Sequence, residues 1–180
     1  KPLKEMMQGK ADVVHNQGNA GNTGRGLIKI DDWLGQDQDT WDVIHFNWGL
    51  WDLCYRNSES KNQGCRDKIN GTVTHPPGEY EQNLNTLVKR LKQTGAKLVW
   101  ASTTPVPEGE LGRKLGDDLV YNKVAEKIMK ANNIPVNDLH AHILPDMTKL
   151  QTKPGDVHFK PAGSKKLARK VAQEIEALLR

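Results

Sequence analysis

The chain has 180 residues and a mass of 20.2 kDa, which suits one domain with a sizeable core, and residues 1–180 are predicted to form a single domain. Of its residues 36% are hydrophobic and 27% are charged, and no apolar run reaches the roughly 18 residues that a membrane-spanning helix needs. Because 26 basic and 22 acidic residues are interspersed, at a net charge of +4, neither a nucleic acid nor a membrane is expected as a partner.

Apolar periodicity in the first half predicts short strands alternating with amphipathic helices. Residues 3–8 predict the end of a helix, and residues 12–15 predict a short strand. A second helix is expected over 27–34 and a second strand over 41–46. Residues 48–77 are rich in Asn, Gly, Ser and Pro and predict a long loop, which in a compact domain is typical of a binding segment.

The second half continues this alternation. The expected elements are a helix over 79–93, a strand over 97–101, a loop over 102–117, a helix over 118–132, a strand over 134–136, a loop to 159 and a helix over 161–179. Strands separated by helices pair in parallel through right-handed crossovers. The predicted fold class is therefore α/β, a three-layer α/β/α sandwich with a parallel sheet, and ligands bind beyond the carboxyl ends of such strands.

A glycine-rich segment follows the first predicted strand. Residues 16–24 read Asn-Gln-Gly-Asn-Ala-Gly-Asn-Thr-Gly and precede a predicted helix. Glycine lets the backbone approach a ligand closely, and a helix start offers free N–H groups to an anion. An oxyanion or phosphate cradle and a plain tight turn both remain open, but the glycine spacing fits neither a dinucleotide fingerprint nor a P-loop.

Asn47 stands where the second predicted strand should end. Its side-chain amide can donate to a developing oxyanion, a contact worth about 3 kcal/mol, or it can simply form an Asx turn that ends the strand. Trp48 and Trp51 follow as candidate substrate-binding residues, because their rings can stack on a sugar; closing the edge of the core is the alternative.

Asp156 stands two residues before His158, just ahead of the last predicted helix. A carboxylate beside an imidazole fixes its tautomer and stabilises its protonated form, as the base of an acyl-transfer reaction requires. An isolated Asp-x-His is often a surface pair, but the Pro-Ala-Gly turn at 161–163 makes this pattern more specific.

In chain order these three segments resemble the SGNH hydrolases, the GDSL-type esterase superfamily, over nearly the whole chain; the most specific match is Val-His-Phe-Lys-Pro-Ala-Gly at 157–163. The resemblance implies the flavodoxin-like SGNH hydrolase fold and a serine mechanism that needs no metal or cofactor. It implies His158 and Asp156 as catalytic residues and Gly21 and Asn47 as oxyanion-hole donors. His-Phe-Asn-Trp-Gly-Leu at 45–50 and Ser-Thr-Thr-Pro-Val-Pro at 102–107 further resemble a bacterial subgroup that acts on acylated carbohydrates.

The chain departs from that family in three ways. The Gly-Asp-Ser block is absent, so the domain is expected to be N-terminally incomplete, lacking its first strand and about 15 to 20 residues, and the 180-residue chain alone is expected to be inactive. The family usually has Asp three residues before His, where this chain has Gly155. Asn47 precedes Gly49 instead of following a glycine, which makes a backbone N–H near Gly49 an alternative donor, and Trp51 stands where the subgroup often has His.

The resemblance implies a serine esterase that deacylates or deacetylates a carbohydrate or small-molecule ester, with the serine supplied upstream of this chain. A non-catalytic glycan-binding or scaffold domain on the same fold is the alternative. A metal-dependent hydrolase built on His140 and His142 is a third hypothesis, although no clear third ligand lies nearby. Ser102 follows a predicted strand, but no nucleophile-elbow pattern surrounds it. His75 is expected to be a surface or loop residue.

Cys54 and Cys65 lie eleven residues apart in the long predicted loop. Both a disulfide, which would contribute at most about 3 kcal/mol, and two free thiols remain open. The cysteine pair and the substrate class together predict a secreted or periplasmic protein. Nothing in the sequence indicates the oligomeric state.

Overall fold

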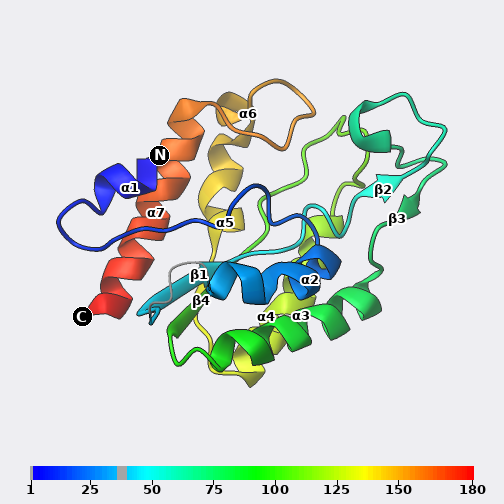
Figure 1. The fold of residues 1–180 in the computed structure, drawn as a ribbon. Helices are drawn as coiled ribbons and strands as arrows, with labels where there is room; N and C mark the ends of the chain where they lie inside the picture. Colours follow the sequence, from blue (N-terminus) through cyan, green and yellow to red (C-terminus); the bar gives the residue numbers. More distant parts are fainter. Residues whose placement is uncertain (1, 36–39) are drawn as a thin grey trace.

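A short parallel sheet forms the centre of the fold in the computed structural model, which describes residues 2–35 and 40–180 (Figure 1). Its strands are β1 (Val43–Phe46), β4 (Lys97–Ala101) and β5 (Val136–Asn137), in the order β1-β4-β5. Val43 lies opposite Lys97, and Trp100 lies opposite Val136, so all three strands run parallel. Within the described residues no strand pairs with the outer edge of β1.

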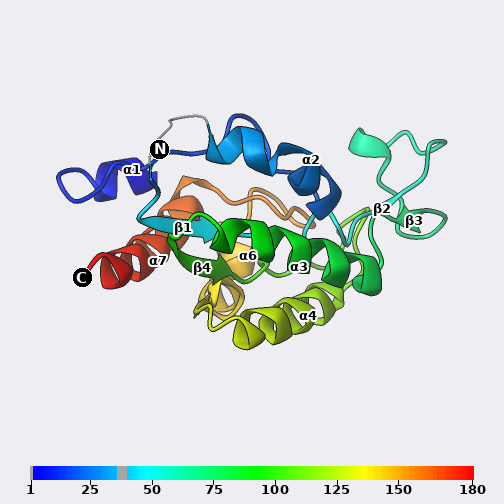
Figure 2. The ribbon, with the colours of Figure 1, turned by 60° about the horizontal axis from the view of Figure 1, so that its bottom comes forward.

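One face of the sheet carries the larger apolar core. Its helices are α2 (Thr23–Leu34), α3 (Pro77–Lys92) and α4 (Asp117–Ala131). Leu98 and Trp100 of β4 are buried against this layer with Leu84 and Leu87 of α3. α3 and α4 lie side by side in both views (Figures 1 and 2).

The opposite face carries a second helical layer. It consists of α1 (Pro2–Met6), α5 (Leu139–Ile143) and α7 (Pro161–Leu179). Ala101 of β4 packs there with Leu139 and Val171, and α1 lies along α7 (Figures 1 and 2). Side chains alternate across a strand, which is why Trp100 and Ala101 enter different cores. The predicted three-layer α/β/α architecture is therefore confirmed.

α7 follows the predicted bounds and is amphipathic. Pro161 occupies its first turn, where a missing N–H costs nothing. Leu167, Val171 and Ile175 face α1 and α5, while the remaining surface carries many charged side chains. No helix in the described ranges is both long and apolar enough to cross a bilayer.

Residues 54–74, here called the arm, extend from the body of the protein between β1 and α3. The arm contains β2 (Tyr55–Arg56), the 3₁₀ turn η1 (Gln63–Cys65) and β3 (Thr72–Val73), and β2 and β3 form an antiparallel pair. In Figure 1 the arm lies at the end of the molecule opposite α1 and the C-terminus. The sequence predicts this region only as a loop, because two-residue strands carry almost no periodic signal.

Two segments differ from the predictions. Residues 12–15 form no strand, since a strand needs a hydrogen-bonded neighbour and the described residues offer none there. The loop expected before residue 159 instead contains α5, the 3₁₀ turn η2 (Leu144–Asp146) and α6 (Met147–Leu150).

Candidate active site

The loop before α7 brings Asp156 and His158 into contact. Asp156 Oδ1 accepts hydrogen bonds from the His158 backbone N–H at 3.0 Å and from ring Nδ1 at 2.6 Å. The other ring nitrogen, Nε2, has no partner among the described residues, and 76% of the His158 side chain is exposed. With Nδ1 donating to the carboxylate, Nε2 carries the lone pair and can accept a proton from an approaching hydroxyl.

The surroundings of Asp156 keep its carboxylate ionised. Burial raises the pKa of Asp156, but hydrogen bonds from the Thr152 hydroxyl and from the ring and backbone N–H of His158 outweigh it and lower the pKa to about 2. Thr152 Oγ1 lies 2.5 Å from Oδ2, so both carboxylate oxygens are engaged. Gly155 adopts a φ of +74°, and this turn lets an aspartate only two residues before the histidine reach the ring.

The glycine turn, residues 16–22, leads directly into α2. Gly21 has a φ of +68°, and a Cβ there would lie 2.8 Å from Arg25 Cδ, so the position favours glycine. The Gly21 N–H, predicted as an oxyanion donor, donates instead to Asn19 Oδ1 at 2.7 Å. Asn19 is exposed, so rotation of its side chain would free the N–H. Asn22 caps α2 by accepting from the Arg25 N–H at 2.8 Å.

The asparagine turn, residues 47–53, begins where β1 ends, as predicted. The Asn47 amide nitrogen donates to Ala101 O at 2.7 Å and to Thr103 Oγ1 at 3.3 Å, which ties the ends of β1 and β4 together. The predicted role of Asn47 as an oxyanion donor therefore requires the amide to release one of these acceptors. Gly49 packs so closely on Thr103 that a Cβ would lie 2.1 Å from Oγ1.

A buried carboxylate that sequence reasoning missed joins these two turns. Asp52 is fully buried and accepts on Oδ1 from the backbone N–H of Thr23 at 2.9 Å, from its hydroxyl at 2.5 Å and from His75 Nδ1 at 2.8 Å. Thr23 Oγ1 also accepts from Asn83 at 3.1 Å. Burial raises the pKa of Asp52, and the bonds from Thr23 and His75 oppose that rise. The start of α2 is thus fixed relative to the asparagine turn. His75 lies in a loop, which is one of its two predicted positions, but its side chain is largely buried.

The two tryptophans have different environments. Trp48 is 4% exposed, and its ring packs beside Phe46 and against Gly26 of α2, so it lacks the open face that a sugar-stacking residue needs. Trp51 is 41% exposed and carries the Arg56 guanidinium 5.0 Å from its ring centroid. Of the two predicted substrate-binding tryptophans, only Trp51 presents its ring to solvent.

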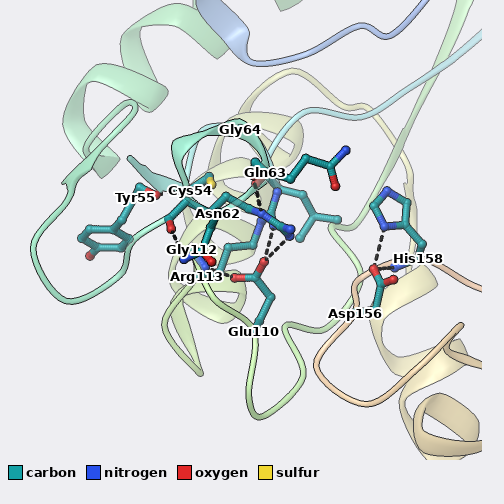
Figure 3. A network of polar contacts seen from close by, with 12 residues as sticks. Cys54, Tyr55, Asn62, Gln63, Gly64, Glu110, Gly112, Arg113, Asp156 and His158 are labelled. Atoms are coloured by element: carbon teal, nitrogen blue, oxygen red, sulfur yellow. Dashed lines mark hydrogen bonds and ion pairs between the residues drawn. The ribbon is translucent and has the colours of Figure 1, made fainter. Parts of the chain in front are cut away.

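A buried ion cluster anchors the arm (Figure 3). Glu110 is fully buried, and its Oε1 lies 2.9 Å from Arg113 NH1 and 3.1 Å from Arg66 NH1 of the arm. Glu110 Oε2 accepts from the Gly112 N–H at 2.6 Å. Nothing in the sequence indicates this cluster, because Arg66 comes from the arm, whereas Glu110 and Arg113 share the loop between β4 and α4.

Contacts of this cluster connect the asparagine turn with residues 155–160, which carry the predicted catalytic pair Asp156 and His158 and are here called the catalytic loop. Arg113 Nε donates to Leu50 O at 2.6 Å, inside the asparagine turn. On its other side, Gly109 precedes Glu110 and packs on Gly155, where a Cβ would lie 2.9 Å from Gly109 O. The glycine turn reaches the same region through the buried carboxylate described above. The glycine turn and the catalytic loop therefore both connect to the asparagine turn at the carboxyl end of β1.

The cysteines are both free, Cys54 buried and Cys65 exposed. Arg56 lies opposite Arg66 in an antiparallel bridge, and the Asn57 N–H donates to Cys65 O at 2.8 Å. This register separates the two cysteines by three positions along the strand, about 10 Å, whereas the Cα atoms of a disulfide lie within about 7 Å. The arm in this register therefore excludes the disulfide.

The residues considered for alternative chemistry have other partners. His140 Nε2 lies 2.7 Å from Asp118 Oδ2, and no cluster of three His, Cys, Asp or Glu within the described ranges could hold a metal ion with His140 or His142. The Ser102 hydroxyl donates to Asp138 Oδ1 at 2.9 Å and accepts from the His140 backbone N–H at 2.8 Å. Ser102 thus ties β4 to α5, and no imidazole nitrogen is positioned to activate it.

Comparison with known proteins identifies the family. Residues 3–166 match the GDSL-like Lipase/Acylhydrolase family over most of the chain. The chain belongs to this family. No protein with a curated description matches this GDSL-like chain.

Solved structures share the fold at low sequence identity. An acetyl xylan esterase, AlAXEase, superposes with a TM-score of 0.72 at 15% identity, covering 96% of this chain and 88% of that one. A lipase/acylhydrolase from Enterococcus faecalis gives 0.74 at 18% identity, covering 98% and 83%. A catalytic mutant of Axe2, an acetylxylan esterase from Geobacillus stearothermophilus, gives 0.64 at 18% identity, covering 87% and 68%. The fold of this chain is therefore the SGNH hydrolase fold.

Proposed function

We propose that this GDSL-like chain forms most of a serine esterase that removes acyl groups, in particular acetyl groups, from a carbohydrate. The observation that carries the proposal is the Asp156–His158 pair, with Nδ1 bound at 2.6 Å and Nε2 open to solvent. The acetyl xylan esterases among the structural neighbours support the substrate class. A secreted or periplasmic location remains a prediction from that substrate class alone, because the cysteines are free.

The dyad supplies the acid–base chemistry of ester cleavage. His158 Nε2 takes the proton of the attacking serine hydroxyl while the serine oxygen bonds to the ester carbonyl carbon. The Asp156 carboxylate stabilises the resulting imidazolium. The same Nε2 then returns the proton to the departing alcohol, which leaves an acyl-enzyme. Water then attacks the acyl carbon while His158 Nε2 takes its proton. The same nitrogen returns that proton to the serine oxygen as the acid leaves.

The oxyanion of the tetrahedral intermediate needs donors that are aimed at it. We assign this role to the Gly21 N–H and the Asn47 amide. Both donate to protein acceptors in this structure, Gly21 to Asn19 and Asn47 to Ala101. The proposal therefore includes an exchange of partners on substrate binding, in which the exposed Asn19 side chain turns away from Gly21.

We place the nucleophilic serine upstream of Lys1, on a strand that pairs with the outer edge of β1. Two features of the edge of β1 support this placement, and one structural neighbour supports a serine as the nucleophile. That edge has no strand beside it in the described residues, and it lies next to the asparagine turn. The Axe2 structure named above is a catalytic mutant in which a serine is replaced by alanine.

A fluorophosphonate probe tests the proposal, because it bonds covalently to activated serines with loss of fluoride. We expect the protein with its upstream residues to be labelled at one serine before Lys1. Labelling should slow by at least about 100-fold in His158→Ala and remain normal in His142→Ala, since general-base catalysis is worth about that factor or more. Equal labelling of the wild type and His158→Ala, or labelling at Ser102, would contradict the assignment.

A non-catalytic glycan-binding domain is the second candidate, and one observation favours it. Both proposed oxyanion donors are already satisfied by the protein, as they would be in a domain that performs no acyl transfer. Isothermal titration with an acetylated xylo-oligosaccharide distinguishes the two functions. Binding without release of acetate would support this candidate, whereas release of acetate would exclude it.

A further inference from the structure

The turn at the tip of the arm is braced from several sides. Arg66 Nε donates to Gln63 O at 2.9 Å, and Arg66 O accepts from the Ser60 hydroxyl and the Asn62 amide, each at 2.9 Å. The Cys65 N–H donates to Asn62 O at 2.8 Å, and Cys65 has a φ of +55°. A side chain larger than glycine persists in that conformation only where its surroundings hold it.

This braced turn is fixed to the catalytic loop through a short series of contacts. The Arg66 guanidinium that bonds Gln63 O also bonds the buried Glu110 carboxylate. Gly109, next to Glu110, packs on Gly155 at the start of the catalytic loop. The position of Gln63 relative to His158 is therefore set by packed and hydrogen-bonded groups.

The Gln63 side chain itself is exposed and unused. Its amide makes no hydrogen bond to any residue that the structure describes, in contrast to its backbone carbonyl. Figure 3 shows this amide extending from the turn toward the imidazole of His158, from the side opposite Asp156. The result is an exposed amide on a fixed turn, with one acceptor and two donor hydrogens, facing the open edge of the histidine.

We propose that Gln63 is a specificity residue that binds hydroxyl groups of the leaving alcohol and so selects esters of polyhydroxy alcohols such as sugars. This rests on the proposed function, in which His158 Nε2 protonates the oxygen of the leaving alcohol. Groups beside that nitrogen therefore face the alcohol part of the ester and not its acyl part. A sugar offers vicinal hydroxyls that donate to and accept from an amide, whereas a simple alkyl alcohol offers none.

Substrate preference provides the first test, in the protein with its upstream residues. The measured quantity is the ratio of kcat/KM for acetylated xylobiose to kcat/KM for ethyl acetate, two esters with the same acyl group. Loss of one or two neutral hydrogen bonds should lower this ratio about three- to tenfold in Gln63→Ala. Gln82→Ala, which removes an exposed glutamine side chain from α3, should leave the ratio at its wild-type value.

An NMR titration of the 180-residue chain provides a second test that needs no catalytic activity. In Gln63→Glu a negative charge would face the imidazole and favour its protonated form. The midpoint of the His158 titration should then lie at a higher pH than in the wild type, because a solvated opposite charge beside the ring favours its protonated form. Gln82→Glu should leave the midpoint in place.

The outcomes separate this inference from the proposed function. A wild-type enzyme that cleaves both esters, with an unchanged ratio in Gln63→Ala, would overturn the role of Gln63 and leave the esterase intact. A wild-type protein that cleaves neither ester would overturn the esterase and this role with it. An unmoved titration midpoint in Gln63→Glu would show that the side chain does not face His158, and would overturn the inference whatever the activity.

Discussion

Glu110→Gln removes the charge of the buried carboxylate between the arm and the body of the protein while keeping its shape. Glu110 is fully buried and Arg113 is 6% exposed, so the arginine would keep its charge in a site with little water. Breaking a buried ion pair from one side costs about 3 to 5 kcal/mol, and the retained amide oxygen places this variant near 3 kcal/mol. That is a large part of the 5 to 15 kcal/mol that stabilises a typical domain.

Urea unfolding at pH 7 measures this loss. With a slope of about 2 kcal/mol per molar urea, a loss of about 3 kcal/mol lowers the midpoint by about 1.5 M. The matched control is Glu81→Gln, whose partner Lys127 is 78% exposed, and this pair should be worth less than about 1 kcal/mol.

A double-mutant cycle with Arg66→Gln isolates the link between Glu110 and the arm. We expect a coupling free energy of at least about 1 kcal/mol, because the two groups are in direct contact at 3.1 Å. A Glu110→Gln midpoint as close to the wild type as that of Glu81→Gln would refute the reasoning. If Glu110→Gln does not fold, Arg66→Gln alone still tests the link, since its expected loss exceeds that of the surface control.

Three further predictions concern pH, packing and thiols. The hydrogen bonds that lower the pKa of Asp156 stabilise the fold at pH values above 3.8, the ordinary pKa of this group. In urea unfolding, the difference in free energy of unfolding between wild type and Asp156→Asn should therefore be constant near neutral pH and vanish as the pH falls from about 4 through about 2. Gly49→Ala should cost about 1 to 3 kcal/mol by the same measurement and be partly rescued by Thr103→Ala, since the new Cβ would lie 2.1 Å from Thr103 Oγ1; no rescue would place the clash elsewhere. A thiol-specific dye should react rapidly with the exposed Cys65. It should react with Cys54 only after unfolding, because Cys54 is buried and its burial raises the pKa of the thiol. Absence of free thiols would contradict the register of the arm.

Long periodic segments made most of the fold predictable from sequence. β4 and α7 lie at the predicted residues, because a short bounded apolar run and a long amphipathic stretch after proline are strong local signals. The helices α5 and α6 have five and four residues, too few for a periodic pattern, and were predicted only as loop. Residues 12–15 have a strand-like sequence but form no strand, because a strand forms only where a neighbouring strand can pair with it.

Sequence distance explains which parts of the candidate site could be predicted. Asp156 and His158 lie two residues apart, so a local pattern was enough to pair them. Thr23 at the start of α2 and the loop residues Asp52 and His75 lie 23 to 52 residues apart, and only the fold brings them together. The sequence alone does not indicate which charged residues in such loops are buried in ion pairs and which are exposed to solvent.

The rate of acetate release from an acetylated xylo-oligosaccharide, in the protein with its upstream residues, tests the central role of His158 most directly. The account predicts that His158→Ala lowers kcat by at least about 100-fold. His142→Ala, a histidine outside the site, should retain the wild-type rate. A His158→Ala enzyme that releases acetate as fast as the wild type would contradict the account.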